Sequence, residues 1–340
     1  MLLPGHFSKN LAALITKTLV QAARLDGKIG GTVQRNGDSP ERHGIPAKQF
    51  SVIAESEKEL HVEMAKYQPD NVRVICVMDD TLAKGVESWA WYGVQPIHIN
   101  LQPGGTVLFI SHRTPQELLQ FVPRKPFDWK IAILDGDPCF AGLWVYKDDG
   151  IDYRTIGAVA HIEPTLVSIH ALREHVSKLP DAERKLQALE AGYARVRIYP
   201  VQAGEGAEDT YVPVEKPGWT EMREGLVIPA VPMGQNNELF KKYTTRTQRP
   251  VIRFDTCIKC EQCYIECPDE CFEIAGDGYF IVNYEHCCGC GICSEICPVE
   301  GCITMVDELR FESNEDLHEL YVQDPQLYND YISEKLEAVR

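Results

Sequence analysis

Eight cysteines in the last third of the chain form two copies of one spacing pattern. The first copy begins at Cys257 and the second at Cys287, and each reads Cys-x2-Cys-x2-Cys-x3-Cys followed by proline. Residues 1–20 do not predict a signal peptide, and in a chain of 340 residues thiols this close together are typical of metal ligands rather than of disulfides. A ligand set made only of thiolates favours iron–sulfur chemistry.

The spacing also predicts how the cysteines are shared between two [4Fe–4S] clusters. Three thiolates on one tight loop can wrap one face of a cubane, whereas the fourth lies too far round and, in two-cluster ferredoxins, ligates the other cluster. The ligands expected for the first cluster are Cys257, Cys260, Cys263 and Cys297. The ligands expected for the second cluster are Cys287, Cys290, Cys293 and Cys267.

Structural zinc is the main alternative, but zinc sites usually separate their Cys-x2-Cys pairs by a dozen residues or more.

Five cysteines remain outside the two motifs. Cys271 and Cys302 follow the two Cys-Pro pairs and are expected to be small core residues beside the clusters. Cys288 is expected to point elsewhere, and Cys76 to lie in a buried strand. Cys139 has no evident partner base for catalysis.

The elements around the cysteines repeat at a spacing of 30 residues, since Cys287 echoes Cys257. Each half is predicted to give a strand, a cysteine loop, a short helix and a strand, with the halves related by a pseudo-twofold axis. The glycines at 276 and 278 are read as the turn between two short strands. Residues 251–308 are therefore predicted to form an α+β two-cluster bacterial ferredoxin-like domain, followed by an acidic, partly helical tail over 309–340 with a helix from about 325 to 339.

Residues 1–200 are predicted to form an α/β domain, in which a mostly parallel sheet is covered by flanking helices. The strands expected from apolar runs cover residues 50–54, 72–78, 96–100, 106–111 and 129–134. The helices expected from apolar periodicity and capping residues cover about 8–25, 114–121, 166–176 and 181–193. Residues 201–250 are rich in glycine and proline and are interpreted as an extended linker.

The charge is distributed unevenly. Residues 1–200 hold 23 Lys and Arg and 23 Asp and Glu, whereas residues 201–340 hold 11 and 27. An acidic lobe argues against nucleic acid as a partner and suits docking to a basic patch on a redox partner, although solubility alone would also explain it. No dinucleotide fingerprint or P-loop occurs. Without a predicted membrane helix, the chain is expected to be cytoplasmic, where thiols stay reduced.

Two segments resemble subunits of the 2-oxoacid:ferredoxin oxidoreductases, the pyruvate:ferredoxin oxidoreductase family. Residues 242–307 resemble the delta subunit, through Thr-Thr-Arg-Thr-Gln-Arg-Pro at 244–250, both cysteine motifs and Met-Val-Asp-Glu at 305–308. Residues 1–200 resemble the gamma subunit through Ser-Pro-Glu-Arg-His-Gly at 39–44. The gamma subunits usually open with Gly-Arg-Gly-Gly-Gln-Gly, whereas this chain has Leu-Pro-Gly-His-Phe-Ser at 3–8, so its handling of coenzyme A is expected to differ.

The resemblance implies a fused gamma–delta electron-transfer subunit, an arrangement similar to that of oxalate oxidoreductase. Thiamine diphosphate and Mg²⁺ would be bound by partner alpha and beta subunits, soluble ferredoxin would be the electron acceptor, and this chain would contain no catalytic residue. The substrate would be pyruvate, a related 2-oxoacid or oxalate. The alternative is a relay and docking adaptor in an unrelated redox complex, and a self-sufficient enzyme on residues 1–200 is disfavoured because no paired nucleophile and base is found.

Overall fold

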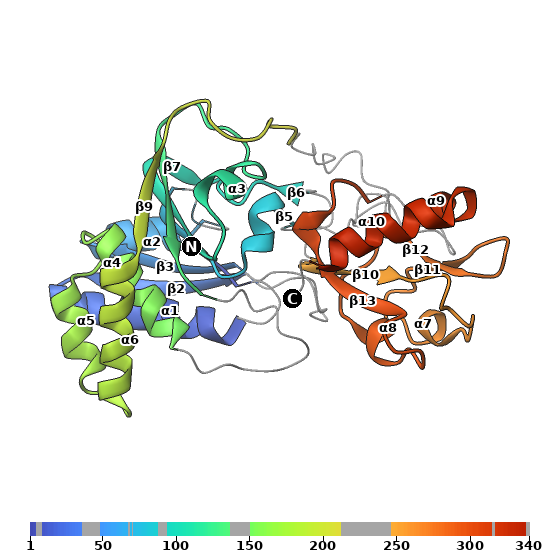
Figure 1. Ribbon diagram of the computed structural model, residues 1–340. Helices are drawn as coiled ribbons and strands as arrows, with labels where there is room; N and C mark the ends of the chain where they lie inside the picture. The colour runs from blue at the N-terminus through green and yellow to red at the C-terminus, as the bar shows by residue number, and fades with distance from the viewer. Residues whose placement is uncertain are drawn as a thin grey trace, which may run out of the picture. The chain divides into compact units, whose positions relative to one another are not determined.

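The computed structural model shows two compact units, one of Met1–Val86 with Pro96–Thr210 and the other of Glu87–Gln95 with Tyr211–Arg340 (Figure 1). The structure describes residues 1–4, 9–35, 48–66, 69, 71–87, 94–136, 150–211, 246–314 and 317–337. Within these residues no helix is long and apolar enough to cross a membrane.

The first unit is built on a seven-stranded sheet with the order β2-β3-β1-β4-β7-β8-β9. Its strands are β1 (Leu2–Leu3), β2 (Ile29–Arg35), β3 (Lys48–Ala54), β4 (Val72–Val77), β7 (Leu101–Ile110), β8 (Trp129–Leu134) and β9 (Arg197–Val201). Strands β1, β4, β7 and β8 are parallel, while β3 pairs antiparallel with β1 and β2, and β9 antiparallel with β8. The parallel centre with flanking helices confirms the predicted α/β class, and the antiparallel strands lie at its edges.

Helices cover both faces of this sheet. They are α1 (Lys9–Ala23), α2 (Glu57–Met64), α3 (Pro115–Leu119), α4 (Ile151–Ile162), α5 (Ile169–Val176) and α6 (Ala182–Arg195), with 3-10 turns η1 (Arg24–Asp26) and η2 (Asp80–Lys84). The short strands β5 (Val86–Glu87) and β6 (Val94–Gln95) form a separate two-stranded sheet where the chain passes into the second unit. Alternate residues of β7 enter opposite cores: Leu108 packs with α1, α4, α5 and α6, whereas Phe109 packs with Leu82 of η2 and Leu118 of α3. This double burial explains why the strand reads as a continuous apolar run.

Most predicted elements of this unit are confirmed, one differs in type, and β1, β2, β9, α2 and α4 were not predicted. The predicted strand at 96–100 is instead a turn over 97–100 that leads into β7, and its apolar content reflects the full burial of Ile97 rather than sheet pairing. Helix α4 was missed because most of its residues are buried, so its few polar side chains do not mark a clear helical period.

The second unit has the predicted twofold arrangement of strands and short helices. Its elements are β10 (Gln248–Ile252), α7 (Gln262–Ile265), β11 (Phe272–Ile274), β12 (Phe280–Val282), α8 (Ile292–Glu295), β13 (Ile303–Asp307), the 3-10 turn η4 (Glu308–Arg310), α9 (His318–Gln323) and α10 (Pro325–Glu337). The first strand pairs antiparallel with the last, and β11 pairs with β12. The predicted turn is present, since the N–H of Gly278 donates to the carbonyl of Ala275 at 2.9 Å.

The tail contains the predicted helix, which begins at Pro325 and is α10. Tyr328 and Ile332 on this helix are buried in the same core as Val251 and Val306. The Tyr328 hydroxyl also donates to the carbonyl of Ile252. Of the residues interpreted as a linker, 212–245 lie outside the described part, and Gln248 already belongs to β10.

Candidate metal centres

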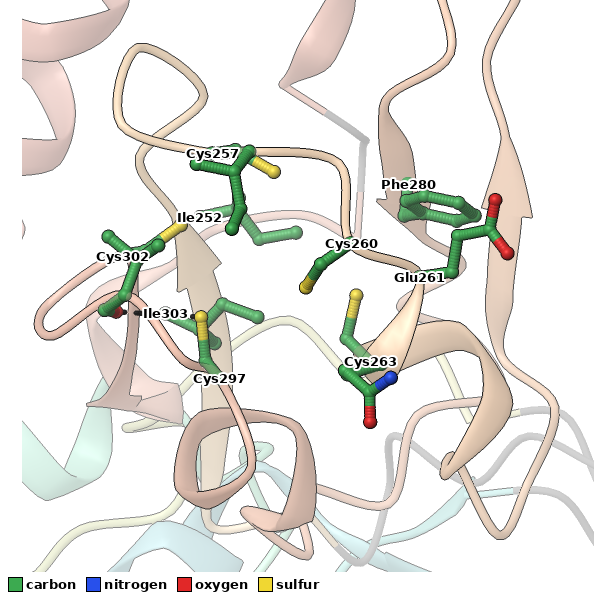
Figure 2. A pocket seen from close by; sticks show the side chains of 12 residues that line it. Ile252, Cys257, Cys260, Glu261, Cys263, Phe280, Cys297, Cys302 and Ile303 are labelled. Atoms are coloured by element: carbon green, nitrogen blue, oxygen red, sulfur yellow. Dashed lines mark hydrogen bonds between the residues drawn. The ribbon is translucent and has the colours of Figure 1, made fainter.

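A cavity that is partly open to solvent lies between the two halves of the second unit. Figure 2 shows the side chains of its cysteines arranged around this space. The cysteines of the lining are Cys257, Cys260, Cys263, Cys297 and Cys302. Cys297 comes from the second motif, just after α8, so one cavity combines three thiols of the first motif with the last thiol of the second.

The reciprocal arrangement forms a second cavity, also partly open to solvent. The cysteines of its lining are Cys267, Cys271, Cys287, Cys288, Cys290 and Cys293. Cys267 is the last thiol of the first motif, and it reaches this cavity because the chain turns at Pro268 toward β11. The thiols line two cavities and do not meet at one point. In the described part of the chain, no three His, Cys, Asp or Glu side chains are placed to bind a single metal ion.

The two cysteine loops share an unusual backbone. Lys259 and Glu261 in the first loop have φ of 57° and 65°, and the equivalent Gly289 and Gly291 in the second have φ of 72° and 86°. Such left-handed residues within a turn curl successive N–H groups into a concave nest that suits anions and iron–sulfur sites. At position 289 glycine is also required by space, because a Cβ there would lie 2.1 Å from the carbonyl oxygen of Gln248.

Hydrogen bonds and burial shift the pKa values of the cysteine thiols. The N–H of Gly289 donates to Sγ of Cys287 at 3.4 Å, and the N–H of Cys271 donates to Sγ of Cys267 at 3.5 Å. A hydrogen bond from the Cys271 thiol lowers the pKa of Cys267 to about 6. Burial raises the pKa of Cys263 to about 11, so this thiol must release its proton when a metal binds. Each cavity is lined by four motif thiols, and at the second cavity backbone N–H groups also donate to sulfur, an arrangement that fits a cubane cluster.

The other cysteines agree with their predicted places except one. Cys271 and Cys302 are buried beside the two cavities, as predicted. Cys76 lies inside β4, where burial raises the pKa of its thiol to about 11. Cys288 was predicted to point away from the clusters, but it lines the second cavity, and its thiol interacts with Cys290. Cys139 lies outside the described residues.

The two loops differ in exposure. In the first loop and the helix after it, Ile258 and Ile265 are 64% and 62% exposed. In the second loop Cys287, Cys288 and Gly289 are buried, and Nε2 of Gln248 donates to the carbonyl of Gly289 at 3.1 Å. The first cavity therefore lies under a more exposed loop of this chain than the second.

A buried ion-pair network beside the second cavity was not predicted. Arg246 and Arg249 both bind the carboxylate of Glu308, and all three side chains are at least 96% buried. The two arginines belong to residues 244–250, a segment that in the sequence indicates only a resemblance to the delta subunit. The spacing of about 60 residues between these charges gives no local signal that they meet.

Comparisons with known proteins agree with this geometry. Residues 250–305 match the 4Fe-4S dicluster domain family. Over 84 residues the chain is 44% identical to the pyruvate synthase subunit PorD of Methanocaldococcus jannaschii, which covers 24% of this chain and 96% of the relative. The PorD subunit of Thermotoga maritima is 35% identical over 97 residues, or 28% of this chain and 94% of the relative. The chain belongs to the delta-subunit family of 2-oxoacid:ferredoxin oxidoreductases.

The delta-like segment is about a quarter of the chain. The chain is also similar to the crystal structure of the pyruvate oxidoreductase subunit PORC from Thermotoga maritima, with a TM-score of 0.40 and 20% identity, over 57% of this chain and 94% of that chain. The chain itself joins a dicluster segment to a separate unit built on a seven-stranded α/β sheet.

Proposed function

We propose that this chain is the fused gamma–delta electron-transfer subunit of a thiamine-diphosphate-dependent 2-oxoacid:ferredoxin oxidoreductase. The observation that carries the proposal is the pair of cavities, each with three thiols of one motif and the last thiol of the other. In this proposal the ligands of the first [4Fe–4S] cluster are Cys257, Cys260, Cys263 and Cys297. The ligands of the second are Cys287, Cys290, Cys293 and Cys267.

The clusters, when bound, supply reversible one-electron transfer. The residues of this chain hold them, shield them from water and fix their spacing. The antiparallel pairing of β10 with β13 and of β11 with β12 ties the two halves together, so the separation of the cavities is set by the sheet registers. Backbone N–H groups that donate to cysteine sulfur favour the reduced state.

The reaction with the 2-oxoacid belongs, in this proposal, to partner alpha and beta subunits that bind thiamine diphosphate and Mg²⁺. Electrons pass from them through this chain to soluble ferredoxin. The similarity to pyruvate synthase subunits supports this assignment. The excess of acidic residues in 201–340 suits an attraction to basic surfaces on redox partners.

Anaerobic purification of the complex from its native source tests the proposal. We expect copurified subunits with bound thiamine diphosphate, about eight irons and eight sulfides on this chain, and ferredoxin reduction that depends on a 2-oxoacid. A screen of pyruvate, longer 2-oxoacids and oxalate, with and without coenzyme A, identifies the substrate. Copurification with hydrogenase or unrelated dehydrogenase subunits would support the relay adaptor instead, and zinc in place of iron would refute both.

A second expectation follows from the exposed first loop. When the isolated, reconstituted chain is treated anaerobically with an iron chelator, the first cluster should be lost several-fold faster than the second, because chelators reach an exposed site more easily. Iron release is followed by absorbance, and electron paramagnetic resonance identifies the surviving cluster. Equal rates of loss, or faster loss of the second cluster, would contradict this expectation.

A further inference from the structure

The guanidinium group of Arg246 is fixed between the second cavity and a carboxylate. Its side chain is fully buried. On one side, Nη1 donates to the carbonyl oxygen of Cys287 at 3.1 Å and to that of Tyr284. On the other side, Nε and Nη2 donate to the two carboxylate oxygens of Glu308 at 2.7 and 2.6 Å. The ion pair is thus oriented, with its positive end toward the cysteine loop and its negative end away from it.

Neighbouring groups hold this orientation. Arg249 binds the same carboxylate through Nε and Nη2 at 3.0 and 2.8 Å and lies over the ring of Phe311 at 4.4 Å. The side-chain oxygen of Asn314 accepts from both arginines, at 2.8 and 3.2 Å. A bidentate, buried arginine keeps its geometry, because its planar donors match the carboxylate and little rotation remains.

The cavity linings each contain one acidic residue. It is Glu261 in the first cavity and Asp269 in the second, so they act in the same direction on the two sites. The first loop also carries a cation, Lys259, but this residue is exposed and its ammonium group donates to the carbonyl of Asp277. The guanidinium of Arg246, which donates to the second loop, is instead fully buried, and this burial distinguishes the second site from the first.

Reduction adds a negative charge to a cluster. A positive charge held nearby in a buried environment favours the reduced state, and salt screens it little. Burial of the second loop favours the oxidised state instead, because a buried environment disfavours the added negative charge. The oriented ion pair offsets this cost at the second site.

We propose that the Arg246–Glu308 pair raises the reduction potential of the cluster bound by Cys287, Cys290, Cys293 and Cys267, and has little effect on the other cluster. This inference rests on the proposed function, since it requires both clusters. Arg246 acts as a positioning and tuning residue through the second loop and is not itself a ligand.

Redox titration of the anaerobic complex, followed by electron paramagnetic resonance, tests the inference. Arg246→Gln should lower the midpoint potential of one cluster only, and Arg246→Lys should retain more of the wild-type value because it keeps the charge. Glu308→Gln should shift the same cluster in the opposite direction, since it removes the negative end of the pair. The affected signal is assigned with Cys290→Ser, which alters the second site.

The opposite signs separate charge tuning from mere loosening of the fold. Downward shifts in both Arg246→Gln and Glu308→Gln, equal shifts of the two clusters, or no shift would overturn the inference. If Arg246→Gln does not assemble, Arg249→Gln decides: a smaller downward shift of the same cluster is expected, and an unchanged potential overturns the proposal. Variants that keep about eight irons but have unchanged potentials would refute only this inference. A wild-type chain that does not bind two clusters would refute the proposed function.

Discussion

Replacement of Cys297 by serine is expected to remove the cluster built mainly by the first cysteine motif, although Cys297 belongs to the second. The side chain lines the cavity of Cys257, Cys260 and Cys263, so its loss leaves three thiols of the two motifs there and four motif thiols in the other cavity. Iron should fall from about eight to about four per chain. Iron and sulfide analysis of the anaerobic protein, with electron paramagnetic resonance to identify the remaining cluster, measures the effect.

The reciprocal change, Cys267→Ser, should remove the other cluster and leave the first. The chain offers a matched control for each variant: Cys302→Ser beside the first cavity and Cys271→Ser beside the second are buried cysteines outside the two motifs. Both controls should keep about eight irons. Loss of the cluster in the same half as the substituted cysteine, or equal iron loss in the controls, would show that the exchange of ligands is wrong.

The sequence was most informative where one short segment determines the geometry. The spacing from Cys257 to Cys267 defines a loop, so three neighbouring thiols could be grouped without knowledge of the fold. The exchange of Cys267 and Cys297 was inferred from the behaviour of doubled motifs, and the structure brings these side chains to the cavities that the inference requires. Cys288 was misjudged because the direction of a side chain next to a ligand depends on the backbone path of the whole loop, which the cysteine spacing does not specify.

Contacts between distant segments were beyond sequence reasoning. The pairing of Arg246 with Glu308 joins residues 62 positions apart, and two buried arginines on one carboxylate have no periodic signature. Helix α4 was missed for a related reason. Its buried surface is composed partly of small residues, Gly157, Ala158 and Ala160, whose role becomes evident only when the helix against which they pack is known.

Helix α4 packs against α6, and a substitution at this contact is expected to have a large effect on stability. Gly192→Ala in α6 should strongly destabilise the first unit. A Cβ at position 192 would lie 1.8 Å from the carbonyl oxygen of Arg154 in α4, and a Cβ on Gly157 would lie 2.0 Å from the carbonyl oxygen of Leu189. The two helix backbones are therefore in direct contact, and no flexible side chain can move aside. Overpacking typically costs about 1–3 kcal/mol of the free energy of unfolding, and a clash between two backbones is expected at the upper end of this range. Denaturant titration followed by far-ultraviolet circular dichroism measures the loss.

The clusters provide an independent readout for the same variant. The cysteines proposed as ligands lie in the other compact unit, whose core is formed by its own strands and by α10. Gly192→Ala should therefore shift the unfolding transition of the helical signal while the visible absorbance of the clusters persists to higher denaturant. Gly276→Ala is the matched control, because a Cβ there meets no atom within 4 Å. Simultaneous loss of helical signal and cluster absorbance would mean that the iron–sulfur unit depends on the α/β unit for its stability, whereas separate transitions would establish that the cluster ligands are held by the second unit alone.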